Sequence, residues 1–246
     1  MITINNLTVS YRQHPALHHI SGHFAAGSLT AVIGPNGSGK STLLKSIVGL
    51  QPKSGGQISI AVEHKEIAYL PQLAEIDRSY PISVRDCVFQ GFWPKLGTFK
   101  GLSAAEMTQA QLAIKTVGLE GFEHRPIATL SSGQFQRALF ARMFVQDARL
   151  ILLDEPFNAM DSKTTAALLE LIRQWHQQKR TVIAVLHDDA QVRAHFPHTL
   201  LLAREVVAWG RTADVLTPMH LHKARAVAEC WDDQAEICTL DSAVVA

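Results

Sequence analysis

Residues 34–41 read Gly-Pro-Asn-Gly-Ser-Gly-Lys-Ser and lie between an apolar run at 29–33 and a helical pattern at 40–48. The stretch fits G-x-x-x-x-G-K-[ST] in the strand-to-helix context that this motif requires. Glycines let backbone N–H groups curl around phosphates, and the positive end of the helix faces them. We therefore predict a nucleoside triphosphate site on a parallel α/β sheet. The residues expected to bind ATP are Gly34, Pro35, Asn36, Gly37, Ser38, Gly39, Lys40, Ser41 and Thr42.

A second apolar strand, predicted at 150–153, delivers Asp154 and Glu155 at its C-terminal end. Open α/β sheets bind their ligands at that end of the strands. Alone, such a pair more often caps a helix, but the phosphate-binding loop upstream favours a catalytic pair. We expect Lys40 to reach the β- and γ-phosphates, Ser41 and Asp154 to hold Mg²⁺, and Glu155 to polarise the attacking water.

The periodicities predict one α/β domain of the P-loop NTPase type with a mostly parallel sheet, an N-terminal antiparallel β subdomain and an inserted helical subdomain. We assign the core to 1–72 and 145–215, the helical subdomain to 73–144, and a C-terminal helix and tail to 216–246. The expected strands are short ones from residue 2 onward, then 29–33, 57–62, 66–70, 150–153, 181–186 and a hairpin of 200–203 with 206–209; the expected helices are 40–48, 104–117 and 163–177.

Composition excludes several classes of protein. The 246 residues hold 23 Lys and Arg against 22 Asp and Glu, which gives no basic footprint for nucleic acid. Three scattered cysteines indicate no disulfide framework and suit a reducing compartment. The longest apolar runs fall far short of the ~20 residues of a membrane-spanning helix, and residues 1–10 lack the pattern of a signal peptide. Any membrane role is therefore expected to come through a partner.

Residues 130–134 read Leu-Ser-Ser-Gly-Gln and precede the Asp154-Glu155 strand by some 20 residues. Here the chain resembles the ABC ATPases, whose Leu-Ser-Gly-Gly-Gln signature it matches at four of five places. Ser132 stands where that family usually has glycine. The resemblance covers roughly residues 2 to 215.

The resemblance implies a dimer of two identical chains with two ATP molecules between them. In the family the signature opens a helix that binds the γ-phosphate of the other protomer's ATP; here its residues are Ser131, Ser132, Gly133 and Gln134. It also implies that Tyr11 stacks on adenine, that Gln72 senses Mg²⁺ and γ-phosphate, that Asp161 crosses the dimer interface, and that His187 is the switch histidine. The alternatives are a strand-edge aromatic for Tyr11, a solvated turn residue for Gln72 and a core histidine for His187.

Further matches are similar to the ATPases of bacterial zinc and manganese importers. They include Tyr-Leu-Pro-Gln at 69–72, Ile-Asp at 76–77, Tyr-Pro-Ile-Ser-Val at 80–84 and Glu-Pro-Phe at 155–157. This implies a partner permease, an extracytoplasmic substrate-binding protein, and a place on the cytoplasmic face of the inner membrane. An importer of an iron chelate or vitamin is the main alternative; a nucleic-acid clamp and a small-molecule kinase are weaker ones. Twelve histidines are present, but their spacing defines no metal site.

The segment from about Ile76 to Lys100 is expected to receive a cytoplasmic helix of the permease, because it follows Gln72. It concentrates aromatic side chains, which are favoured anchors at protein interfaces. The alternative for each is the core of the helical subdomain. The aromatic residues are Phe89, Phe92, Trp93 and Phe99.

Overall fold

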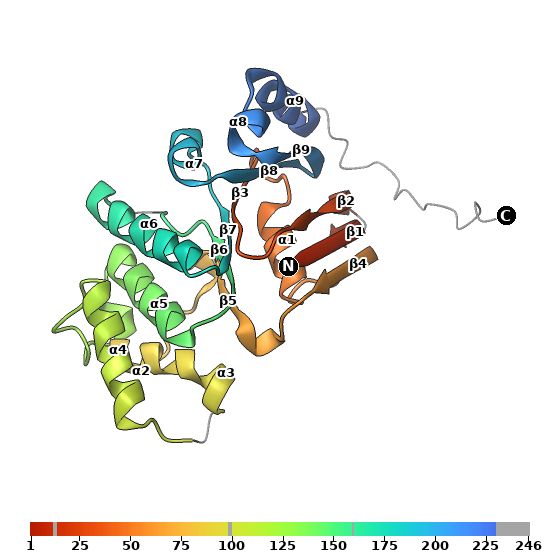
Figure 1. The fold of residues 1–246 in the computed structure, drawn as a ribbon. Helices are drawn as coiled ribbons and strands as arrows, with labels where there is room; N and C mark the ends of the chain where they lie inside the picture. Colours follow the sequence, from red (N-terminus) through yellow and green to blue (C-terminus); the bar gives the residue numbers. More distant parts are fainter. Residues whose placement is uncertain (12–13, 98–99, 159, 230–246) are drawn as a thin grey trace.

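The computed structural model describes residues 1–11, 14–97, 100–158 and 160–229. A three-stranded antiparallel sheet of order β2-β1-β4 lies beside a six-stranded sheet of order β5-β6-β7-β3-β8-β9 (Figure 1). The smaller sheet comprises β1 (Ile2–Tyr11), β2 (His14–Phe24) and β4 (Gly55–Ile60). The larger comprises β3 (Leu29–Ile33), β5 (Ile67–Leu70), β6 (Leu150–Asp154), β7 (Thr181–Val185), β8 (His198–Ala203) and β9 (Glu205–Arg211).

The larger sheet is parallel except at β9, which pairs antiparallel with β8. Its strands β3, β6 and β7 are buried along their whole length. Such burial explains why they read as continuous apolar runs rather than as alternating patterns. The parallel order brings the carboxyl ends of β3, β6 and β7 to one edge of the sheet.

Helices cover the sheet and form the C-terminal part of the described chain (Figure 1). On α6, Leu168, Leu171, Ile172 and Trp175 are buried, and Trp175 stacks on Phe140 of α5 with ring centroids 6.1 Å apart. The helices outside residues 73–144 are α1 (Lys40–Ile47), η1 (His64–Glu66), α6 (Ser162–Gln177), α7 (Asp189–His195), α8 (Thr212–Val215) and α9 (Pro218–Glu229).

Residues 73–144 form the helical part at the lower left of Figure 1. The described residues of this range contain one isolated β-bridge, between Ser83 and Pro126, and no strand. Ser103 caps α4 as expected, since its side chain accepts from the Glu106 N–H. The helices here are η2 (Leu73–Glu75), α2 (Val84–Phe89), η3 (Gln90–Phe92), α3 (Trp93–Leu96), α4 (Ala104–Thr116), η4 (Ile127–Thr129) and α5 (Ser132–Gln146).

The N-terminal strands are longer than expected. β1 has 10 residues and β2 has 11, so the prediction of short strands was wrong. The two strands stay paired through β-bulges, where Asn6 and His19 have φ of 51° and 52° and their side chains hydrogen-bond at 2.6 Å.

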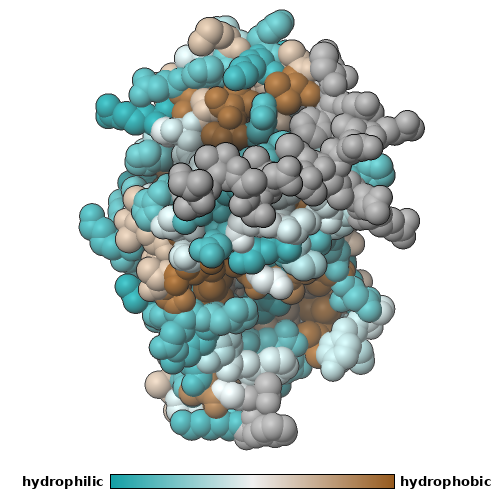
Figure 2. Space-filling view, turned by 90° about the vertical axis from the view of Figure 1, so that its right-hand side faces the viewer, coloured by the Kyte–Doolittle hydropathy of each residue, from teal (hydrophilic) through white to brown (hydrophobic). Residues whose placement is uncertain are grey.

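No helix in the described ranges is long and apolar enough to cross a membrane. Figure 2, a view onto the right-hand side of Figure 1, shows apolar residues gathered in patches in the upper part of that face and below its middle. Hydrophilic residues cover most of the remainder. The longest apolar runs of the sequence are not on this surface, because they form the buried strands β3, β6 and β7.

We predict that Gly22→Ala lowers the free energy of unfolding by about 1–3 kcal/mol. Gly22 on β2 touches Trp209 on β9 between the two sheets, and an added Cβ would lie 2.2 Å from the indole ring. Trp209 cannot turn away easily, because its ring centroid lies 4.5 Å from that of Phe24. Urea unfolding measures the loss.

The matched control is Gly55→Ala on β4, where an added Cβ would meet Thr8 at an ordinary 3.9 Å. Its stability should stay within about 0.5 kcal/mol of the parent. Equal losses in the two variants would contradict the proposed contact between the sheets.

Candidate functional site

The loop between β3 and α1 requires glycine at two positions. Gly34 has φ of 152°, and an added Cβ would lie 1.9 Å from the carbonyl oxygen of Leu202. Gly39 has φ of 90°, and a Cβ added there would lie 2.4 Å from the carbonyl oxygen of Ala16. The left-handed backbone and the close neighbours leave no room for a side chain. The loop can therefore adopt this tight path into α1 only with glycine at both positions.

Lys40 is the first residue of α1 and is only 6% exposed. Its ammonium donates to the carbonyl oxygens of Gly34 at 2.9 Å and Pro35 at 2.8 Å. Burial lowers the pKa of Lys40, and the nearby Glu155 and Asp154 carboxylates oppose that effect. Beside it the Ser38 hydroxyl is buried and has no hydrogen-bond partner among the described residues. The cradle therefore presents a cation and a free hydroxyl to an anionic ligand.

Asp154 ends β6 at 0% exposure. Its Oδ1 accepts from the Ser41 hydroxyl at 2.9 Å, whereas its buried Oδ2 has no partner in the described part of the chain. Burial raises the pKa of Asp154 to about 6, although the bond from Ser41 lowers it. A hydroxyl beside an orphaned carboxylate oxygen suits a hard cation with oxygen ligands, and these residues therefore fit Mg²⁺.

Gln72 follows the carboxyl end of β5 and joins the two halves of the site. Its amide donates to the Ser41 hydroxyl at 3.0 Å and to Oε1 of Glu155 at 2.8 Å. The solvated-turn alternative therefore does not describe Gln72 in this structure. One side chain thus contacts both Ser41, beside Asp154, and the second carboxylate, Glu155.

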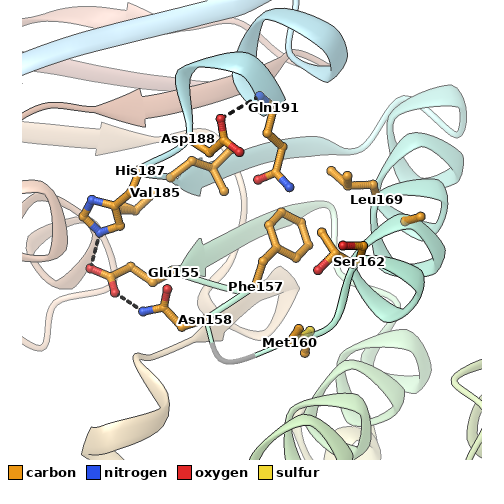
Figure 3. Close-up of a pocket in the computed structure, with 13 residues that line it drawn as sticks. Glu155, Phe157, Asn158, Met160, Ser162, Leu169, Val185, His187, Asp188 and Gln191 are labelled. Atoms are coloured by element: carbon orange, nitrogen blue, oxygen red, sulfur yellow. Dashed lines mark hydrogen bonds and ion pairs between the residues drawn. The ribbon is translucent and has the colours of Figure 1, made fainter.

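The side chains of His187 and Asn158 point toward Glu155 (Figure 3). Its Oε1 is 2.7 Å from Nε2 of His187, and its Oε2 accepts from the amide of Asn158. His187 is exposed, which excludes the core-histidine alternative. Phe157 points into the adjoining cleft of about 420 Å³ between α6 and α7. With Gln72, these contacts hold a carboxylate at the carboxyl edge of the sheet.

Tyr11 and Asp161 lie further from this centre. Tyr11 ends β1 with 44% of its surface exposed, and its hydroxyl is 3.5 Å from that of Thr42. An exposed ring beside α1 is available for stacking. Asp161 caps α6 by accepting from the Thr164 N–H at 2.8 Å, and this bond lowers the pKa of its carboxyl.

Residues 131–134 begin α5. Ser131 is the N-cap, with its hydroxyl accepting from the Gln134 N–H and the Gln134 amide oxygen accepting in return. Ser132 is the first helical residue and is not among the described residues with positive φ. No hydrogen bond between described residues joins this segment to the loop at 34–41. Ser131 is exposed and residues 132–134 are partly exposed, so a ligand held elsewhere could reach the N-terminus of α5.

Two residues near the site were not predicted from the sequence. Asn158 bonds Glu155, and Arg78 donates to the carbonyl of Leu130 while its guanidinium lies 5.0 Å from the Phe135 ring centroid. Neither belongs to a motif with a mechanism of its own. The one signal for Asn158 was a polar side chain three residues after Glu155 in a loop.

The comparison with known families agrees with this geometry. A family model described as "ABC transporter" matches residues 17–158, more than half of the chain. The chain belongs to the ABC transporter family. As a member, it is an ATP-binding subunit and an ATPase, and its fold class is that of the ABC cassettes.

Individual relatives of this ABC ATPase cover nearly its whole length. The manganese transport system ATP-binding protein MntB of Listeria monocytogenes is 38% identical and aligns over 87% of the chain and 91% of the relative. The zinc transport system ATP-binding protein TroB of Treponema pallidum is 36% identical, over 91% and 86%.

Solved structures match as well. An inward-facing ABC transporter assigned to a metal-chelate type superposes with a TM-score of 0.80 at 30% identity, over 92% of this chain and 88% of that one. The dimeric ABC transporter cassette MJ0796 gives 0.76 at 24% identity, over 86% and 99%, and supports the fold alone.

We predict that Asp154→Asn stabilises the nucleotide-free ABC ATPase at pH 8 by up to about 3 kcal/mol. The pKa of Asp154 rises from 3.8 to about 6 in the folded chain, and each pH unit is worth about 1.4 kcal/mol. Because the folded pKa is the higher one, the cost of ionisation is absent below pH 3.8 and complete above about pH 6. Asparagine avoids that cost and can still accept from Ser41.

Chemical unfolding of both proteins from pH 4 to pH 8, with a chelator and without nucleotide, measures the difference. The advantage of the variant should grow through pH 4 to 6 and then level off. A difference that does not depend on pH would contradict the proposed burial of charge.

Proposed function

We propose that this chain powers the import of a divalent transition metal, zinc or manganese, as the ATPase pair beneath a membrane permease. The assignment of the metal is supported by relatives of 35–38% identity that are named as manganese or zinc transport ATP-binding proteins. The chemistry rests on one observation, the hydrogen bonds that join Glu155 to Gln72 and His187 beside the phosphate-binding loop. ATP is the substrate that is hydrolysed, and Mg²⁺ is expected to bind with it.

Binding of ATP begins in the loop at 34–41. Lys40 exchanges the carbonyl oxygens of Gly34 and Pro35 for the β- and γ-phosphates, while Ser38 donates its unpartnered hydroxyl. Ser41, Asp154 and Gln72 would hold Mg²⁺, which supplies neutralisation of charge on the phosphate oxygens when bound. Loop N–H groups and Thr42 complete the phosphate contacts, and Tyr11 stacks on the adenine.

Hydrolysis then depends on orientation. Glu155 polarises the attacking water, and its carboxylate is aimed by the Gln72 amide and by Asn158. His187 exchanges its bond with Glu155 for a donor bond to the γ-phosphate when ATP is present. Positioning and electrostatic stabilisation account for most of the catalysis in phosphoryl transfer.

A second copy completes each site. Ser131 and Gly133, with Ser132 and Gln134, lie at an exposed helix N-terminus that suits the γ-phosphate of ATP held by the partner. Support comes from the capping geometry of α5 and from the absence of any described hydrogen bond between this segment and its own loop at 34–41. Asp161 is expected to act across the same interface.

The remaining partners follow from the transporter role. A permease would hold the dimer on the cytoplasmic face of the inner membrane, an extracytoplasmic protein would deliver the metal, and nucleic acid has no part. The docking surface is proposed at residues 76–100. Trp93 is 47% exposed there, whereas Phe92 is 3% exposed and belongs to the core. Phe89 is half-buried, and Phe99 lies outside the described residues.

We predict that Glu155→Gln keeps ATP affinity within about threefold but lowers turnover by at least about 100-fold. Glutamine retains the shape and loses the charge that orients water. Light scattering should show the variant as a monomer without nucleotide and as a dimer with ATP. Turnover near the parental rate, or no ATP-dependent increase in mass, would contradict the proposed site.

The transported substrate is tested in the source cells. Cells lacking the chain should regain uptake of radioactive manganese or zinc with the parent and not with Glu155→Gln. Restored uptake of an iron chelate or a vitamin instead would refute the metal assignment while leaving the ATPase intact.

We predict that Trp93→Ala weakens capture of the permease and transport at least fivefold, with ATP hydrolysis by the free subunit unchanged. Truncating an exposed aromatic anchor removes binding energy of about 1 kcal/mol or more without opening the core. Leu112→Ala is the control, because Leu112 is 55% exposed on α4, outside the proposed surface. Equal capture by the two variants would rule Trp93 out as an anchor.

A further inference from the structure

A buried glutamine connects α5 to the loop that carries Glu155. Gln136 is 1% exposed, and its amide donates to the carbonyl oxygen of Pro156 at 3.1 Å across 20 residues of sequence. Its own oxygen, Oε1, has no hydrogen-bond partner among the described residues. Burying an amide with one half unsatisfied costs free energy, so packing alone does not account for glutamine here.

The peptide that Gln136 holds follows directly on Glu155. Glu155 has φ of 50°, although residues before proline favour extended backbone with negative φ. Pro156 has no N–H with which to fix the turn, and the turn's own bond, from the Asn158 N–H to the Glu155 carbonyl, is 3.4 Å long. An anchor from outside the turn therefore matters for the direction of the Glu155 side chain.

The other end of the connection is rigid. Gln136 lies in the second turn of α5, after the Ser131 cap and next to Phe135, which is 1% exposed. Arg78 packs its guanidinium on the Phe135 ring and donates to the carbonyl of Leu130. The first turns of α5 are thus clamped, and Gln136 transmits their position to Pro156.

We propose that Gln136 is a positioning residue for hydrolysis: it fixes the Pro156 peptide and so aims the Glu155 carboxylate at the attacking water. This rests on the proposed function of Glu155. The N-terminus of the same helix is proposed to contact the ATP that the partner protomer binds. A contact there would therefore influence Glu155, which acts on the ATP bound by its own protomer. Gln136 makes that link through a single hydrogen bond.

The test compares Gln136→Met with Gln146→Met. Methionine approximates the volume of glutamine and lacks the donor. Gln146 lies on the same α5 and donates to the carbonyl of Ile67 at 2.8 Å, away from Glu155. Gln136→Met should lower kcat by about 10- to 100-fold, as a misplaced catalytic group does, with KM for ATP within threefold. Gln146→Met should keep kcat within twofold. Similar kcat values for both variants would overturn the proposal.

A second variant separates positioning from loss of structure. In Gln136→Glu the introduced carboxyl is kept neutral near pH 6 by burial and can donate its proton to the Pro156 carbonyl; ionised at higher pH, it repels that oxygen. Its kcat relative to the parent should be at least fivefold higher at pH 6 than at pH 8.5. A ratio that does not change with pH overturns the proposal, and this comparison decides alone if Gln136→Met does not fold.

The reference for both assays is Glu155→Gln. If that variant keeps parental turnover, the proposed function itself fails, whatever Gln136 does. If turnover requires Glu155 and yet tolerates Gln136→Met, only the positioning role of Gln136 is lost.

Discussion

The register of three buried parallel strands is the constraint on which the site depends. Val185 of β7 pairs with Val32 of β3 on one side and with Asp154 of β6 on the other. The phosphate-binding loop after β3, the carboxylates at the end of β6 and His187 after β7 therefore reach one edge together. A slip of one residue would turn each strand's side chains over and separate them. The apolar runs determine the strand register, and the register determines the relative positions of these site residues.

The charged side chains at the carboxyl edge of the sheet lower the stability of the fold. Lys40, Asp154 and Glu155 share a small region in which burial disfavours the charged forms of Lys40 and Asp154. The Lys40 ammonium donates to carbonyl oxygens of its own loop, and one oxygen of Asp154 has no hydrogen-bond partner among the described residues. A ligand with phosphates and a cation supplies partners for both side chains. These residues therefore contribute less to the stability of the fold than the apolar core does, which is the usual relation between a binding site and its scaffold.

Motifs and burial patterns in the sequence predicted the fold class and most of the residues around Glu155, since each residue type has few uses at the end of a buried strand. Contacts between distant segments were not predictable. Arg78 and Gln136 act through tertiary hydrogen bonds, and Asn158 acts through a bond within the loop that follows β6; no periodicity of the sequence indicates any of them. The bulges at Asn6 and His19 were not predicted, because the sequence does not distinguish a polar residue at positive φ from the other polar residues of a strand. The aromatic cluster indicated an interface without distinguishing buried Phe92 from exposed Trp93.

Ser132 shows how the structure changes the meaning of a departure from a motif. Glycine is required where the backbone is left-handed or a neighbour is too close, as at Gly34. Ser132 begins α5 with an ordinary helical backbone, so serine meets no such conflict. The next residue, Gly133, has nothing within 4 Å of where a Cβ would stand, which leaves space in front of the helix N-terminus. Ser132 itself lines a hollow of about 450 Å³ with Gln72, Arg78 and Glu155. Ser132 thus borders a hollow that it shares with the Glu155 of its own protomer, and Gly133 keeps the approach to the helix N-terminus open.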